Sequence, residues 1–294
     1  MLKQYMYERK NIIDKNLEEY LNELQNPYVI AEGMKYSVLN GGKRLRPLLL
    51  LMGLQLLGHD ENLGIPSGCA IEMIHSYSLV HDDLPALDND KFRRGQLTTH
   101  AKFGEAEGIL IGDALLTHAF NILVEKNKGL SPVQILEIIR KTSDYSGING
   151  MIGGQMVDIE SEGKEIDYDT LKYIHKHKTG KLIKLPLEVA CIIAGASEEQ
   201  KKSIEEYGEL IGLAFQIKDD ILDVEGDFEK LGKPIGSDLA LEKSTYPSIF
   251  GLEKSKEILK EVIDKAKKVL EDNFEFENRK LLIDLADFLL NRES

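Results

Sequence analysis

Residues 80–95 carry the side chains best suited to chemistry, because aspartates crowd positions 82–90 and two arginines follow at 93 and 94. Two like charges about 4 Å apart repel by roughly 4 kcal/mol at an effective dielectric of 20, so a fold that gathers carboxylates normally supplies a cation. Carboxylate oxygens favour Mg²⁺ or another hard divalent ion, and planar guanidinium groups suit phosphate. The same residues would also fit a solvated acidic loop, which is what most charge runs are.

A second acidic group lies far along the chain, at Asp219, Asp220 and Asp223. Asp219 and Asp223 are four residues apart and share one helix face, where like charges are unfavourable unless a cation lies between them. Apolar neighbours such as Ile217 and Ile221 argue against a solvated face. Each acidic group ends an apolar helical stretch, so the two could meet across a bundle and hold more than one divalent ion together with substrate phosphate.

Several basic side chains fall in motifs, and their number would suit two diphosphates: Lys43, Arg46, Arg93, Arg94, Lys178, Lys233 and Lys243. The sequence has no nucleotide-binding loop of a known kind, because Gly42-Lys43 lacks the earlier glycine of a P-loop and no G-x-G-x-x-G occurs. Asp88-Asn89-Asp90 is not an EF-hand, since the glycine and the final glutamate of that loop are missing. The cations and carboxylates together indicate a site for metal ions and phosphate groups.

Helical periodicity dominates the regions that must position these residues. It predicts a helix over residues 65–81, which leads into the first acidic group, and one over 197–223, which ends in the second. Further helices are predicted over residues 5–25, 30–39, 48–57, 105–125, 132–144, 168–195, 246–270 and 277–292, with a connector at 98–103 and a turn-rich loop at 224–244. With almost no period-two pattern and no linker, we expect one all-α domain, a large helical bundle over residues 1–294.

Glycines interrupt the otherwise helical pattern of residues 147–160, at Gly150, Gly153 and Gly154. A glycine inside a helix costs about 1 kcal/mol relative to alanine. Three of them predict that another backbone or a ligand approaches this stretch closely.

The overall charge is acidic, with 37 Lys+Arg against 50 Asp+Glu and a formal net charge of −13. This balance argues against nucleic acid as a partner. Cys69 and Cys191 lie far apart in apolar helical contexts, and we expect buried thiols of a reducing, cytoplasmic environment. No signal-peptide pattern and no apolar run of ~18 residues is found, so we expect no stable membrane insertion.

Six motifs in order resemble those of the short-chain trans-prenyl diphosphate synthases, most of all the bacterial farnesyl type. They are Gly41–Pro47 (GGKRLRP), Asp82–Gly95 (DD, four residues, D, then RRG), Gly153–Asp158 (GGQMVD), Lys178–Gly180 (KTG), Phe215–Asp223 (FQIKDDILD) and Gly232–Asp238 (GKPIGSD). Each motif is weak alone, but six across residues 30–292 are specific. The resemblance implies the all-α bundle of isoprenoid synthases around a central active-site cavity.

The resemblance also implies a role for each matching residue. Three Mg²⁺ ions, which Mn²⁺ could replace, would be held by Asp82, Asp83, Asp88, Asp219 and Asp223. The allylic diphosphate would be bound by Arg93, Lys178, Thr179, Gln216 and Lys233, and isopentenyl diphosphate by Gly42, Lys43, Arg46, His75 and Arg94. Gln155 and Asp158 would support these ligands, and Lys243 would shield the diphosphates. Catalysis itself would rest on Asp82, Asp88, Arg93, Lys178, Asp219 and Lys233.

The implied reaction is the head-to-tail condensation of isopentenyl diphosphate with dimethylallyl and then geranyl diphosphate, giving (2E,6E)-farnesyl diphosphate. Tyr77, with Ser78 beside it, lies four to five residues before Asp82, where bulk would close the pocket floor at a C15 product. The alternative is that Tyr77 is an ordinary core residue. The resemblance further implies a homodimer formed through residues 105–125, and it leaves open whether Arg292 near the chain end reaches the isopentenyl site.

Other functions stay open on the sequence alone. A geranylgeranyl diphosphate synthase would share the first acidic motif and differ near Tyr77. A terpene cyclase would carry an Asn/Ser/Glu-type second motif instead of Asp219–Asp223, and would not need Lys43 and Arg46. A non-catalytic subunit would tend to lose aspartates, and both acidic groups are intact here.

Overall fold

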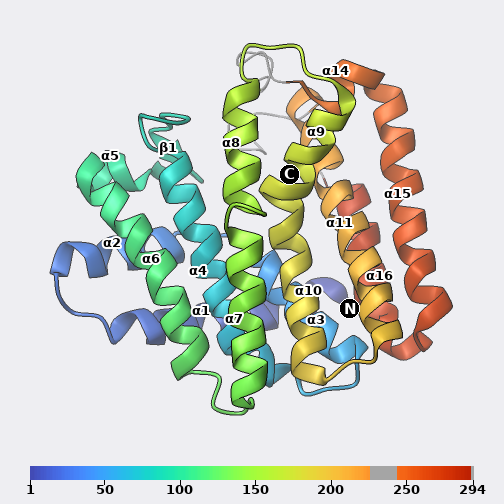
Figure 1. Ribbon diagram of the computed structural model, residues 1–294, viewed down its shortest axis with the longest axis horizontal. Helices are drawn as coiled ribbons and strands as arrows, with labels where there is room; N and C mark the ends of the chain where they lie inside the picture. The colour runs from blue at the N-terminus through green and yellow to red at the C-terminus, as the bar shows by residue number, and fades with distance from the viewer. Residues whose placement is uncertain (226–243, 293–294) are drawn as a thin grey trace. The chain divides into compact units, whose positions relative to one another are not determined.

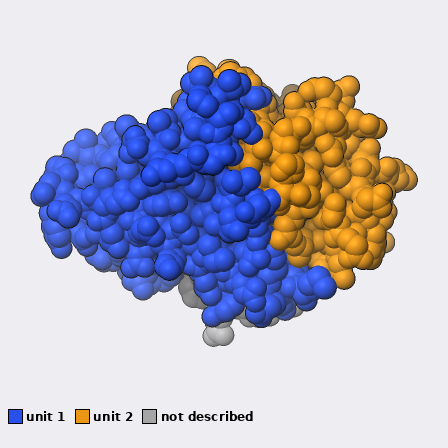
Figure 2. Space-filling view, turned by 90° about the horizontal axis from the view of Figure 1, so that it is seen from below, with its two compact units in different colours: residues 1–51, 60–139 blue, residues 52–59, 140–294 orange. Residues whose placement is uncertain are grey.

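The computed structural model describes residues 1–225 and 244–292. The chain forms two compact units (Figure 2). Unit 1 comprises Met1–Leu51 and Asp60–Ile139, and unit 2 comprises Met52–His59 and Arg140–Ser294. Two helices have residues in both ranges, α3 (Leu45–Leu56) and α7 (Pro132–Ser146).

Unit 1 is built around α4 (Ile65–Asp82), the helix that leads into the first acidic group. It packs on α6 (Glu105–Glu125) and α1 (Leu2–Asn22), and α2 (Tyr28–Leu39) packs against α4 and α6 (Figure 1). A 3₁₀ turn, η1 (Glu61–Gly64), precedes α4. Pro66 lies in the first turn of α4, a position where proline favours the start of a helix. Ile71 and Ile74 of α4 are fully buried, each stabilising the fold by about 1.5–3 kcal/mol.

A small hairpin follows the acidic turn, with β1 (Phe92–Arg93) paired antiparallel to β2 (Gln96–Leu97). Arg94 and Gly95 form its two-residue turn, and both have positive φ, which is typical of a type I′ hairpin turn. The short helix α5 (Thr99–Phe103) then packs on α6 and α2.

Helix α6 is long and apolar enough to cross a membrane when judged by length and composition alone, and among the described residues no other helix meets those limits. Core helices of soluble proteins pass the same test. One face of α6 is buried through Ile111, Leu115 and Ala119, against α4, α2 and α5.

Unit 2 is built around the long helix α11 (Glu198–Glu225), which packs against α15 (Leu252–Asn273), α10 (Lys181–Ala194), α14 (Tyr246–Phe250) and α16 (Phe276–Asn291). A π-helical turn, η2 (His175–Gly180), joins α9 (Tyr168–Ile174) to α10. It packs against α8 (Met151–Ser161) and α11. Tyr207 of α11 is fully buried, and its hydroxyl donates to the Leu282 carbonyl at 2.7 Å.

The predicted all-α architecture is confirmed, and most helices lie within a few residues of the predicted ranges. Four features differ. The β1–β2 hairpin was not predicted, and the predicted connector at 98–103 contains α5. The predicted helix 246–270 breaks at Gly251 into α14 and α15, and η2 interrupts the helix predicted over 168–195. Cys69 and Cys191 are free and buried as predicted. The expectations of one domain and a central cavity stay predictions.

Candidate active site

The first acidic motif lies at the end of α4, where Asp82 is the last helical residue and Asp83 caps it. The turn that follows brings the chain back, because the backbone N–H of Asp88 donates to the Asp82 carbonyl at 3.0 Å. Asp83 is buried, Asp82 is half-buried and Asp88 is exposed. The first and last aspartates of the motif are thus held close in backbone position.

Arg93 clamps the middle aspartate. Its Nε donates to both carboxylate oxygens of Asp83, at 2.8 and 3.0 Å, and its Nη2 lies 2.6 Å from Oδ1. Burial raises the pKa of Asp83, an effect that the Arg93 charge opposes. Both residues keep their predicted roles, metal binding for Asp83 and allylic diphosphate binding for Arg93, as predictions. In this structure the two side chains bind each other.

The hairpin also ties the acidic motif to the GGKRLRP loop. Arg94 Nη1 donates to the Gly41 carbonyl at 2.6 Å. Gly42 has φ +120°, a backbone conformation that favours glycine, and a Cβ placed there would lie 2.8 Å from Arg94 Nη1 and displace the guanidinium. Lys43 beside it is exposed.

Cationic groups gather around this loop in unit 1. Arg46 is half-buried, and its Nε is enclosed with no hydrogen-bond partner among the residues the structure describes. Burial lowers the pKa of Arg46 to about 10, and the nearby Arg94 charge adds to that shift. Burial together with the charges of Arg46 and Arg94 lowers the pKa of His75 well below its ordinary value, which keeps the imidazole neutral. The group offers donors and positive charge to an anion.

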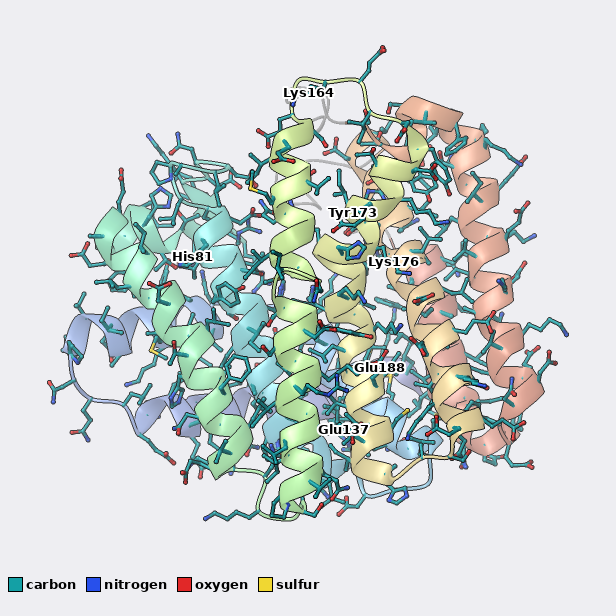
Figure 3. The ribbon with its side chains drawn as sticks, in the orientation of Figure 1. His81, Glu137, Lys164, Tyr173, Lys176 and Glu188 are labelled. Atoms are coloured by element: carbon teal, nitrogen blue, oxygen red, sulfur yellow. The ribbon has the colours of Figure 1, made fainter. Side chains whose placement is uncertain are left out.

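Tyr77 is buried on α4, with its ring edge-on to that of His81 at a centroid distance of 5.7 Å. His81 in turn donates from Nε2 to the Ile109 carbonyl of α6 at 3.0 Å (Figure 3). The Tyr77 hydroxyl is buried and has no partner within the described ranges. Ser78 donates its hydroxyl to the His75 carbonyl at 2.8 Å. The predicted part of Tyr77 and Ser78 in setting chain length stays a prediction.

The second acidic motif lies in the last turns of α11, in unit 2. Asp219 forms an ion pair with Arg292, whose guanidinium lies 4.3 Å from the centre of the Phe215 ring. Asp220 is buried and accepts the backbone N–H of Tyr246 at 2.9 Å. Asp223 is half-buried. The cationic side chain of Arg292 therefore already binds Asp219, one of the predicted metal ligands.

The π-helical turn presents Lys178 and Thr179. Gly154 of α8 lies against its backbone, and a Cβ there would lie 2.2 Å from the Lys178 nitrogen. This is the close approach that the glycines of 147–160 predicted. Lys178 Nζ donates to Asp158 of α8 at 2.7 Å, so Asp158 contacts a predicted ligand directly. In Figure 3, Tyr173 and Lys176 lie on the α9–η2 segment that carries the turn.

Lys233 and Lys243, with the motif Gly232–Asp238, lie outside the described residues. Gln216 and Gln155 are half-buried. A cavity of about 480 Å³ in unit 2 is lined by residues of α3, α11, α15 and α16, and none of the predicted site residues lines it.

Sequence reasoning missed two sets of side chains that support the motifs. Arg44, inside the basic loop, is buried in an ionic network with Asp14 and Glu72. His175 has its Nε2 3.8 Å from Asp220 and its ring stacked on Tyr246. The one available signal was Glu72, a carboxylate within an otherwise apolar helical stretch.

Three comparisons with known proteins bear on this chain. The sequence model of the polyprenyl synthetase family matches residues 27–276. The farnesyl diphosphate synthase of Geobacillus stearothermophilus is 45% identical over 92% of this chain and 91% of its own. The geranylgeranyl diphosphate synthase of Cyanophora paradoxa is 42% identical over 99% and 96%. The crystal structure of an FPP/GFPP synthase from Zymomonas mobilis superposes with a TM-score of 0.87 at 34% identity, covering 98% of both chains.

Proposed function

We propose that this chain, which belongs to the polyprenyl synthetase family and is a prenyltransferase, condenses isopentenyl diphosphate with dimethylallyl and then geranyl diphosphate to give (2E,6E)-farnesyl diphosphate. The observation that carries the proposal is the cationic group of unit 1: the loop Gly41–Pro47 holds Lys43 and Arg46, Arg94 donates to its Gly41 carbonyl, and the charges of Arg46 and Arg94 help to keep His75 neutral. Such a group binds diphosphate through charge-assisted hydrogen bonds.

In this reaction the C–O bond of the allylic diphosphate breaks, the double bond of isopentenyl diphosphate attacks the allylic cation, and a proton is lost. Lys43, Arg46, His75 and Arg94 would orient isopentenyl diphosphate. Arg93, Lys178, Thr179, Gln216 and Lys233 would bind the allylic diphosphate and stabilise the charge that develops on it as it leaves. The apolar side of α4 around Tyr77 would exclude water from the cation. The departing diphosphate is the proposed proton acceptor.

The donor set fits Mg²⁺, which we propose as the resident ion, three in number and replaceable by Mn²⁺. The described residues contain no group of three His, Cys, Asp or Glu side chains close enough to hold an ion. Mg²⁺ needs no such group, because it is usually bound through one or two carboxylates and substrate phosphates. Asp82, Asp88, Asp219 and Asp223 are oxygen donors with solvent access. When bound, the ions would neutralise the leaving diphosphate.

An aspartate from each acidic motif should be needed for efficient turnover. We expect Asp82→Ala and Asp219→Ala each to lower kcat by at least about a hundredfold, because each removes charge stabilisation in the transition state. Glu137→Ala, an exposed carboxylate of α7 (Figure 3), is the matched control and should leave kcat unchanged. The measurement is release of diphosphate from geranyl and isopentenyl diphosphate. Full activity in both aspartate variants would favour a non-catalytic role for the motifs.

Product length distinguishes the proposed farnesyl product from geranylgeranyl diphosphate, the second candidate, since relatives of both names match the chain. We expect Tyr77→Ala to lengthen the product beyond C15, because it removes a buried ring from α4. Tyr77→Phe is the control, and it should keep the C15 product because the hydroxyl has no partner in the described part of the chain. Products are identified by chromatography. An unchanged product from Tyr77→Ala would remove this residue as the floor of the pocket.

We also propose that the protein is a cytoplasmic homodimer. Its buried free thiols suit a reducing compartment. Exposed apolar side chains on α6 and α7 offer a surface for a second copy: Ile109, Leu110, Val124, Val133 and Leu136.

A further inference from the structure

Two residues near the end of α2 hold the β1–β2 hairpin at its base. The Tyr36 hydroxyl donates to the Leu97 carbonyl of β2 at 2.7 Å. The next residue, Ser37, has its Oγ 2.9 Å from Thr99 Oγ1, at the start of α5. Ser37 donates its own proton to the Gly33 carbonyl at 2.7 Å, so Thr99 is the donor of that contact. Helix α2 is therefore hydrogen-bonded both to β2 and to α5.

The turn of the hairpin contacts the same part of the chain a few residues further on. Arg94 lies in that turn, and its Nη1 donates to the Gly41 carbonyl at 2.6 Å. Gly41 begins the loop that carries Lys43 and Arg46. Hydrogen bonds thus join α2 and the loop after it to the hairpin, both at its base and at its turn.

The hairpin is closed on itself, so its base and its turn are mechanically linked. Phe92 pairs with Leu97 in the antiparallel ladder. Just beyond the ladder, the Thr98 hydroxyl donates to the Asp90 carbonyl at 2.6 Å. A shift of Leu97 at the base would therefore displace Arg94, which lies three residues earlier in the turn.

The two arginines of the hairpin depend on this anchor to different degrees. Arg93 has an anchor of its own, because its Nε donates to both oxygens of the buried Asp83, at 2.8 and 3.0 Å. Arg94 is exposed, and its guanidinium is oriented by the contact with the Gly41 carbonyl. Loss of the Tyr36 hydrogen bond should therefore move Arg94 more than Arg93.

We propose that Tyr36 is a positioning residue for isopentenyl diphosphate: its hydroxyl holds the base of the hairpin and so determines where the Arg94 guanidinium meets the loop Gly41–Pro47. This inference rests on the proposed function, because it assumes that Arg94 and that loop bind the substrate. Tyr36 itself touches no substrate in this assignment. It acts through Arg94, so the effects of the two residues on affinity should not be additive.

The first test removes one hydroxyl from the full-length enzyme. Tyr36→Phe keeps the ring, which packs edge-on against Phe103 at a centroid distance of 5.6 Å, so the variant should fold. We expect its affinity for isopentenyl diphosphate to fall about three- to tenfold, and its affinity for geranyl diphosphate to change by less than about twofold. Each substrate is titrated alone by calorimetry, so that no condensation occurs. Tyr28→Phe, at an exposed tyrosine of the same helix, is the matched control and should bind both substrates like the wild type.

A double-mutant cycle then shows whether Tyr36 acts through Arg94. Arg94→Met alone should weaken isopentenyl diphosphate binding by about tenfold or more, because it removes a charge-assisted contact. Adding Tyr36→Phe to Arg94→Met should change the affinity by less than about twofold, since the guanidinium that Tyr36 positions is gone. A merely structural role of Tyr36 would give the same loss in both backgrounds.

That equal loss would overturn the inference. It is also overturned if Tyr36→Phe weakens both substrates equally, or if either Tyr36→Phe or Arg94→Met binds isopentenyl diphosphate like the wild type. A wild-type enzyme that neither binds isopentenyl diphosphate nor forms product would contradict the proposed function itself, and the inference with it.

Discussion

At the scale of single residues, three arginines of the candidate site already bind a partner within the protein. Arg93 holds Asp83, Arg94 holds the Gly41 carbonyl, and Arg292 holds Asp219. Each of these cations or its partner is a predicted ligand of a diphosphate or a metal ion. At these three positions, binding would therefore proceed by exchange of partners. The cost of exchange is modest where a partner is exposed, as Asp219 is, because solvent screens such pairs.

Arg292 gives this view a test. Since its guanidinium binds Asp219, it competes with any metal ion for that carboxylate. We expect Arg292→Gln to raise Mn²⁺ affinity by a few-fold, in keeping with the roughly 0–1 kcal/mol of a partly exposed pair. Arg292→Lys keeps the charge and should bind Mn²⁺ like the wild type. Titration followed by electron paramagnetic resonance measures free Mn²⁺ directly, and equal affinities in all three proteins would show that Arg292 does not compete.

At the scale of elements, the position of Lys178 depends on how closely α8 approaches η2. Gly154 allows that approach, so Gly154→Ala should force the two apart and lower the free energy of unfolding by about 1–3 kcal/mol. We also expect the KM for geranyl diphosphate to rise more than that for isopentenyl diphosphate, because Lys178 moves. Met156→Ala, on the exposed side of α8, is the control. Unchanged stability of Gly154→Ala would mean that η2 shifts freely.

Long elements were predictable from sequence, and short ones were not. The helix over 105–125 was placed correctly because its apolar period runs for many turns. The β1–β2 hairpin, α5 and η2 have too few residues to carry a period, and tertiary contacts such as that of α5 with α6 decide them. Arg44 was missed for a related reason. In the sequence it is one more cation in a basic run, and only the fold shows that it alone of that run is buried against Asp14 and Glu72.

At the scale of the whole molecule, family membership follows from comparisons that span nearly the full chain, and the fold of the relatives is the all-α fold predicted from sequence. Assembly belongs to the same scale. We expect sedimentation to give a dimer for the wild type and a monomer for Leu110→Asp/Leu136→Asp, because these substitutions place charge on the exposed apolar face of α6 and α7. Tyr28→Asp, at another exposed apolar position, should stay dimeric. A dimer in every variant would place the interface elsewhere.

The two buried cysteines have a practical consequence for studying this protein. Burial raises the pKa of both thiols, that of Cys191 to about 12, so neither forms the thiolate that reacts with maleimides. A single cysteine introduced at an exposed position such as Ile148 would then be the reactive one. Site-specific fluorescent labelling of this protein therefore does not require replacement of Cys69 and Cys191.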